Sequence, residues 1–173
     1  MQADEDVKQA DPAAGNVAGN IAAKVFAKPE SDRCRVFLVE DDEDDSLFSQ
    51  RQLEASGKVG EVKCFANGED LINFMRQEGF EDRSVLCMVP TIIIVDINMP
   101  RMDGFKVLQR LKSDRFLEEI PIVVLSGELS YETIRKALDL RADGVLRKPL
   151  HVDKLKEFFK NAWQWPTQEM WLA

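Results

Sequence analysis

The stretch TIIIVD, residues 91–96, decides the fold, because a run of four apolar residues leads directly to an aspartate. A strand that is apolar at every position has to be covered on both faces, which is the condition of a parallel sheet with helices on each side. RVFLV at residues 35–39 and PIVVLS at residues 121–126 are similarly apolar. These three segments predict the buried centre of a parallel sheet.

Helix-like segments alternate with these strands along the chain. GFKVLQRLK, residues 104–112, places Val107, Leu108 and Leu111 on one helical face. The other predicted helices span residues 44–56, 70–77, 131–140 and 152–163, and the other predicted strands span residues 61–66 and 142–148. Five successive β–α units predict an α/β fold with an open, doubly wound, five-stranded parallel sheet, because right-handed crossovers leave few other topologies.

The charge of the chain argues against two classes of function. The chain has 31 Asp and Glu against 23 Lys and Arg, a formal net charge of −8. This balance disfavours a surface that neutralises nucleic-acid phosphates or anionic lipid. No apolar run approaches the roughly 18 residues of a membrane span, and the first residues are acidic where a secretory signal is basic. We therefore expect a cytoplasmic protein that binds neither nucleic acid nor membrane.

A length of 173 residues, 45% of them hydrophobic, suits one domain with tails. Residues 1–31 contain few apolar side chains among many Ala, Gly, Asn and Asp, so they predict a flexible N-terminal tail. The domain is expected to span residues 32–165, and residues 166–173 are expected to form a C-terminal tail.

Chemically versatile residues follow the carboxyl ends of the predicted strands, where sheets of this kind bind their ligands. Glu40 and Asp41 follow the first strand, Asp96 ends the third, Ser126 ends the fourth and Lys148 ends the fifth. Three carboxylates at one rim repel one another unless their pKa values rise or a cation binds among them. Because oxygen ligands select a hard ion, the cluster predicts Mg²⁺.

The same residue types are the parts of a phosphoryl-transfer site. A carboxylate can act as a nucleophile and form an acyl phosphate, and a hydroxyl can donate to a phosphoryl oxygen. An ammonium group adds a second positive charge, and catalysis at such sites consists mainly of positioning and charge neutralisation.

Four segments, in this order, resemble the signature segments of bacterial response-regulator receiver domains: VFLVEDD, IIIVDINMPRMDGF, IVVLSG and VLRKPL. The resemblance covers about residues 32–163. It implies the flavodoxin-like (βα)5 receiver fold with strand order 2-1-3-4-5. It also implies a stand-alone, two-component response regulator of the chemotaxis or phytochrome-associated type.

The resemblance implies that Asp96 accepts a phosphoryl group from a phosphohistidine on a sensor histidine kinase or a histidine phosphotransfer protein. Asp41, Asp96 and the backbone carbonyl of Asn98 would hold Mg²⁺ or Mn²⁺, and Glu40 would assist through water. The acidic run continues through residues 42–45, so this assignment depends on distance from the end of the strand.

Ser126 is implied to donate a hydrogen bond to the phosphoryl group, and Lys148 to form an ion pair with it. Asn98 and Glu128 stand two positions after Asp96 and Ser126, where residues of this family influence the lifetime of the acyl phosphate. An amide and a carboxylate there imply a short-lived signal. On this interpretation the protein is not a conventional enzyme, but it catalyses its own phosphorylation and dephosphorylation.

One residue departs from the family pattern. The family usually has Tyr or Phe three positions before the lysine of the fifth strand, and this chain has Val145. Relay of the signal by that aromatic side chain cannot operate in the usual way. Because few residues follow Lys148, output is expected through protein contact, with a homodimer through the fourth helix, fifth strand and fifth helix as one candidate.

Three alternatives stay open from the sequence. A haloacid-dehalogenase-like phosphohydrolase needs a general acid two positions after the nucleophile, where this chain has Asn98. A flavodoxin-type electron carrier needs a loop rich in hydroxyls and glycine after the first strand, where this chain has EDDEDD. An unphosphorylated pseudo-receiver that serves only as a scaffold would have little reason to keep the whole set of residues.

Overall fold

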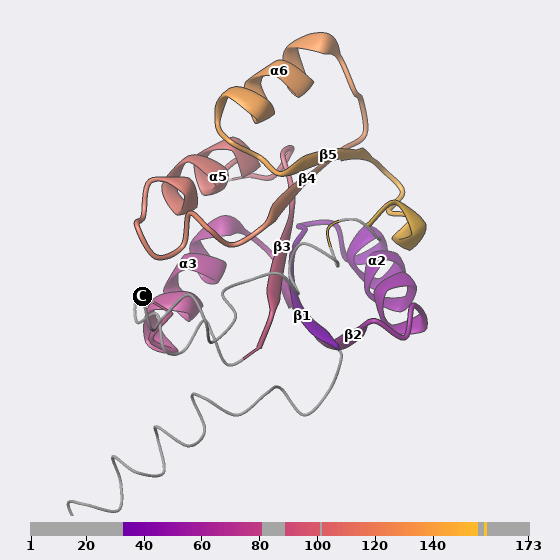
Figure 1. The fold of residues 1–173 in the computed structure, drawn as a ribbon. Coiled ribbons are helices and arrows are strands. Elements are labelled where there is room, and N and C mark those ends of the chain that lie inside the picture. The colour runs from indigo at the N-terminus through magenta and orange to yellow at the C-terminus, as the bar shows by residue number, and fades with distance from the viewer. Residues whose placement is uncertain (1–32, 81–88, 101, 156–157, 159–173) are drawn as a thin grey trace, which may run out of the picture.

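The computed structural model describes residues 33–80, 89–100, 102–155 and 158 of the chain (Figure 1). The predicted tails at residues 1–31 and 166–173, and both predicted domain boundaries, lie outside the described residues.

Strands and helices alternate through the described chain. Their bounds are β1 (Cys34–Val39), α2 (Glu43–Ala55), β2 (Val59–Phe65), α3 (Gly68–Gln77), β3 (Thr91–Asp96), α5 (Gly104–Lys112), β4 (Ile122–Ser126), α6 (Tyr131–Asp139), β5 (Gly144–Arg147) and the 3₁₀ helix η1 (Val152–Leu155). Every neighbouring pair of strands is parallel, and the order across the sheet is β2-β1-β3-β4-β5. The predicted fold and strand order are therefore confirmed.

Most boundaries fall within two residues of the predicted ones. The strand at residues 91–96 and the helix at residues 104–112 have the bounds that their patterns predict. The fifth strand is shorter than predicted and covers only Gly144–Arg147. The helix predicted at residues 152–163 begins with the 3₁₀ turn η1, and most of the rest lies outside the described residues.

The sheet has a separate hydrophobic core on each face, because successive side chains of a strand point to opposite faces. One face carries Phe37, Val39, Ile93 and Val95, which pack against the helices α3, α5 and α6. The opposite face of the same strands packs against α2, η1 and the half-buried Phe158. Figure 1 shows α3 and α5 on one side of the sheet and α2 on the other. The three central strands are therefore almost wholly buried, as their composition predicts.

Polar side chains fix where the helices begin. The first residue outside each of α2, α3, α5 and α6 accepts a hydrogen bond from the backbone N–H three positions later, the usual N-cap arrangement. These N-cap residues are Asp42, Asn67, Asp103 and Ser130. Three of the four helices, α2, α3 and α6, begin within five residues of the carboxyl end of the preceding strand. Helix α2 begins two residues after Asp41.

A buried lysine joins three parts of the fold away from this rim. The Lys112 ammonium, at the end of α5, donates to the carbonyls of Glu118 (2.9 Å) and Ile120 (3.0 Å) and to Asp143 Oδ2 (2.8 Å). The same Asp143 oxygen accepts the backbone N–H of Ile122 (2.8 Å). The Lys112 side chain is buried while Asp143 is partly exposed. The contact therefore ties the loop before β4 to the start of β5.

No helix in the described part of the chain is both long enough and apolar enough to span a membrane.

We predict that Lys112→Met lowers the free energy of unfolding by about 2–4 kcal/mol, because it leaves two carbonyls and a carboxylate without their buried partner. Urea unfolding followed by circular dichroism measures this change. Lys106→Met on the exposed side of the same helix is the matched control, and we expect it to change the free energy by less than about 0.5 kcal/mol. Equal effects of the two substitutions would contradict a stabilising role for the Lys112 contacts.

Candidate functional site

Three carboxylates meet where β1 and β3 end. β1 and β3 are hydrogen-bonded neighbours, with Val39 opposite Val95, so the residues that follow in register are Glu40 and Asp96. One oxygen from each of Glu40, Asp41 and Asp96 lies within 4.8 Å of the other two. The structure therefore brings together the three acidic residues that the sequence singled out. The neighbouring residues of the acidic run are outside this group.

The three carboxylates differ in their exposure to solvent. Glu40 and Asp96 are buried, whereas Asp41 is exposed. Burial, and secondarily the charge of Asp96, raises the pKa of Glu40, although Lys148 and the backbone N–H of Asp42 act in the opposite direction. The buried Oε2 of Glu40 forms an ion pair with Lys148 and accepts no other hydrogen bond in the described structure. Three carboxylates this close together form the polar environment expected around a cation.

Lys148 supplies positive charge to this cluster. Its Nζ lies 2.6 Å from Glu40 Oε2, 3.0 Å from Asp96 Oδ2 and 3.0 Å from Asp45 Oδ2. Burial acts to lower the pKa of Lys148, but the contacts with Glu40, Asp96 and Asp45 outweigh it, so the pKa lies above its ordinary value. Lys148 is therefore a permanent cation that offsets part of the negative charge.

Asp45 is the residue of this site that the sequence did not single out. It lies in the first turn of α2, where its N–H donates to the N-cap residue Asp42 (2.9 Å). Its side chain points to Lys148, 103 positions away in the sequence. The only signal in the sequence was its position four residues after Asp41. If a helix starts at the acidic run, this spacing places the two side chains on the same side.

The Ser126 hydroxyl lies in a tight turn at the end of β4. Its Oγ donates to the carbonyl of Glu128 (2.5 Å) and accepts the N–H of the same residue (3.2 Å). The backbone N–H of Lys148 donates to the Ser126 carbonyl (2.9 Å), which links the ends of β4 and β5. Ser126 is buried, and the Glu128 residue is exposed. The hydroxyl is therefore engaged within its own turn, and no contact with Asp96 is seen among the described residues.

The loop after Asp96 stays close to the end of β3. The backbone N–H of Asn98 donates to Asp96 Oδ1 (3.2 Å), while the Asn98 residue is exposed. Gly104, the first residue of α5, lies against this loop so closely that a Cβ at this position would overlap the Asp96 carbonyl oxygen. Glycine is therefore required here for close approach of backbone to backbone.

Two further features concern β5 and the loop after it. Val145, which stands where the family usually has an aromatic residue, is half-buried and packs at the edge of one core. The peptide bond between Lys148 and Pro149 is cis.

The residues present fit a divalent metal ion of the hard class. All donors in the cluster are carboxylate oxygens. Oxygen ligands favour Mg²⁺ or Mn²⁺, whereas zinc prefers nitrogen and sulfur ligands.

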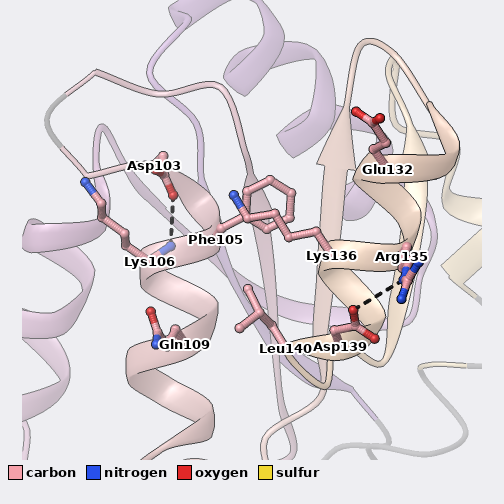
Figure 2. A pocket seen from close by; sticks show the side chains of 9 residues that line it. All are labelled: Asp103, Phe105, Lys106, Gln109, Glu132, Arg135, Lys136, Asp139 and Leu140. Carbon is pink, nitrogen blue, oxygen red and sulfur yellow. Dashed lines mark hydrogen bonds and ion pairs between the residues drawn. The ribbon is translucent and has the colours of Figure 1, made fainter.

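A separate groove of about 450 Å³ runs between α5 and α6 (Figure 2). Two of its cationic side chains have partners nearby: Arg135 lies 3.7 Å from Asp139, and the Lys136 ammonium lies 4.0 Å from the centre of the Phe105 ring. No member of the carboxylate cluster lines this groove. The groove therefore does not form part of the candidate site.

Comparison with known proteins agrees with this geometry. The sequence profile of the response regulator receiver domain matches residues 36–160. The response regulator Rcp1 of a Synechocystis species is 30% identical over 125 residues, which are 72% of this chain and 81% of Rcp1.

Solved structures have the same fold. The phosphorylated cyanobacterial phytochrome response regulator RcpA is 31% identical, with a TM-score of 0.58 over 82% of this chain and 95% of RcpA. The Mn²⁺-bound form of Rcp1 gives a TM-score of 0.56 at 24% identity, over 76% of this chain and 93% of that one. With the profile match covering most of its length, the chain belongs to the family of response regulator receiver domains.

Proposed function

We propose that this protein is a single-domain response regulator that accepts a phosphoryl group on Asp96 and signals through protein contact. The donor is a phosphohistidine of a sensor histidine kinase or a histidine phosphotransfer protein, and the site of action is the cytoplasm. One observation carries the proposal: in a chain of this family, the buried Asp96 carboxylate lies 3.0 Å from the Lys148 ammonium and within 4.8 Å of two more carboxylates.

Asp96 has the position and the surroundings of a nucleophile. In the proposed step an oxygen of Asp96 forms a bond to phosphorus while the bond from phosphorus to the histidine nitrogen breaks, and that nitrogen keeps the electron pair. The carboxylate with one negative charge becomes an acyl phosphate with up to two. Lys148 offsets part of this added charge at contact distance. The Asn98 N–H on Asp96 Oδ1 holds the carboxylate in one orientation.

Asp41, Asp96 and the carbonyl of Asn98 are proposed to hold Mg²⁺ or Mn²⁺, with Glu40 acting through a water molecule. When bound, the ion neutralises charge between the carboxylates and the phosphoryl oxygens. The three carboxylate oxygens that lie within 4.8 Å of one another support a cation at this place. The Mn²⁺-bound structure of Rcp1 supports the same class of ion.

Ser126, Asn98 and Glu128 are proposed to act on the phosphoryl group after transfer. The Ser126 hydroxyl has to leave the Glu128 carbonyl in order to donate to a phosphoryl oxygen. This exchange would connect phosphorylation to the loop between β4 and α6. Both Asn98 and Glu128 are exposed, so their side chains have access to water and can orient it for hydrolysis. We therefore propose a short-lived acyl phosphate.

The face of α6, β5 and the fifth helix is the proposed contact surface, including a homodimer. Two large apolar side chains of α6 lie in solvent, since Tyr131 is 76% exposed and Leu138 is 55% exposed. With Val145 in place of an aromatic residue, movement of the Ser126 turn is the proposed route from the phosphoryl group to this surface.

We predict that acetyl phosphate and Mg²⁺ label the unmodified protein with an acid-stable, base-labile phosphoryl group, and that Asp96→Asn abolishes the label. The label should be lost because the side-chain amide of asparagine cannot form an acyl phosphate. Intact-protein mass spectrometry and a gel that separates the phosphorylated form measure the labelling.

Exposed Asp139→Asn is the control for this experiment, and it should be labelled as fully as the unmodified protein. Absence of label on the unmodified protein would favour the scaffold alternative. Turnover of unrelated phosphate esters would favour a hydrolase, and a bound chromophore would favour a flavoprotein. Each of these outcomes would overturn the proposed function.

We predict that Asp41→Asn weakens Mn²⁺ binding by about tenfold or more, because a change even in outer-shell partners alters metal affinity on this scale. Electron paramagnetic resonance of free Mn²⁺ measures the affinity, and competition with Mg²⁺ extends the result to that ion. The exposed Asp44 belongs to the same acidic run, and Asp44→Asn removes the same charge outside the cluster. An equal loss in both variants would mean that the acidic run binds ions only through its overall charge.

A further inference from the structure

One ammonium group at the site has three carboxylate partners. Oxygens of Glu40, Asp45 and Asp96 all lie within 3.0 Å of Lys148 Nζ. A lysine ammonium has only three N–H donors. A fourth anionic oxygen can approach Lys148 as closely only when one of these three moves away. A phosphoryl group on Asp96 uses one carboxylate oxygen for its bond to phosphorus and brings several anionic oxygens to the same place, so more oxygens compete for Lys148.

The three partners differ in how easily they can leave. The side chains of Glu40 and Asp96 are 1% and 4% exposed, while that of Asp45 is 48% exposed. A buried carboxylate that loses its cation keeps an uncompensated charge away from water, which is strongly unfavourable. Asp45, in the first turn of α2, can rotate into solvent at little energetic cost, because half-exposed ion pairs are weak.

The negative charge added by phosphorylation also favours withdrawal of Asp45. Attachment of a phosphoryl group adds negative charge at Asp96, next to Lys148. Asp45 is then a second anion that contacts the same ammonium, so repulsion between the two favours its withdrawal. Asp96 carries the phosphoryl group and Glu40 is held by the buried end of β1, which leaves Asp45 as the partner that can withdraw.

We propose that Asp45 is a positioning residue that holds Lys148 in the unphosphorylated protein and gives up this contact to the phosphoryl group when Asp96 reacts. The inference rests on the proposed function, because it requires Asp96 to be the phosphoacceptor. The contact between Asp45 and Lys148 slows phosphorylation of Asp96. It does not affect hydrolysis of the acyl phosphate, because it is already absent in that state.

The test compares two matched substitutions in the full chain. Asp45→Asn removes the carboxylate that contacts Lys148. Asp44→Asn removes the same charge from the adjacent exposed residue, which has no contact with Lys148. Phosphorylation by acetyl phosphate at saturating Mg²⁺ and hydrolysis after removal of the donor are measured separately for each protein.

We expect Asp45→Asn to be phosphorylated about two- to fivefold faster than Asp44→Asn, the factor that corresponds to loss of a half-exposed ion pair. Hydrolysis of the acyl phosphate should proceed at the same rate in both variants. Asp45→Glu, which keeps the charge on the same helical turn, should return the phosphorylation rate toward that of the unmodified protein.

A spectroscopic measurement tests the contact itself in the unmodified protein. Beryllofluoride, an analogue of the phosphoryl group, is added to protein labelled with ¹³C at aspartate carboxyl carbons. We expect the Asp45 signal to move when the analogue binds, because Asp45 loses its contact with Lys148, and the Asp44 signal to stay.

The outcomes separate this inference from the proposed function. Equal phosphorylation rates in the two variants, or a parallel change in hydrolysis, would overturn the role of Asp45 while Asp96 remained the phosphoacceptor. An unchanged Asp45 signal on binding of beryllofluoride would do the same. Failure to label Asp96 in the unmodified protein would overturn both.

Discussion

The structure of the site depends on the ion contacts between Lys148 and the carboxylates at the rim of the sheet. Glu40 and Asp96 are buried at the ends of two adjacent strands, where unpaired charges are expensive. Lys148 approaches both from the end of β5. Without this cation the two acids could stay charged side by side only if another positive group replaced it.

The parallel sheet explains why these residues meet. β1, β3, β4 and β5 all point in the same direction, so residues that are far apart in the sequence leave the sheet at one rim. The backbone hydrogen bond from Lys148 to Ser126 fixes how far β5 extends past β4. The close approach of Gly104 to the Asp96 carbonyl turns the chain directly into α5. The backbone of each acid and of the lysine is therefore held in place by the end of a strand.

The sequence predicted much of this arrangement because its signals were local. Three uninterrupted apolar runs mark strands that are covered on both faces, and β3 has the predicted bounds. Glu40, Asp41 and Asp96 could be named because they follow such strands directly. β5 was harder to delimit, because it is an edge strand of only four residues with half-buried side chains and little apolar contrast to its flanks. Asp45 could not be separated from its acidic neighbours for a different reason, since its role depends on a partner in a distant segment.

The sequence by itself determined the fold class and the set of residues at the rim, because strand periodicity and parallel crossovers depend on local composition and chain direction. The order of the strands followed from the resemblance to receiver domains. Only the tertiary structure decided which carboxylates share Lys148 and that the Ser126 hydroxyl bonds to Glu128. These are contacts between side chains from separate elements. Their distances depend on how the helices and strands pack, which no local pattern in the sequence specifies.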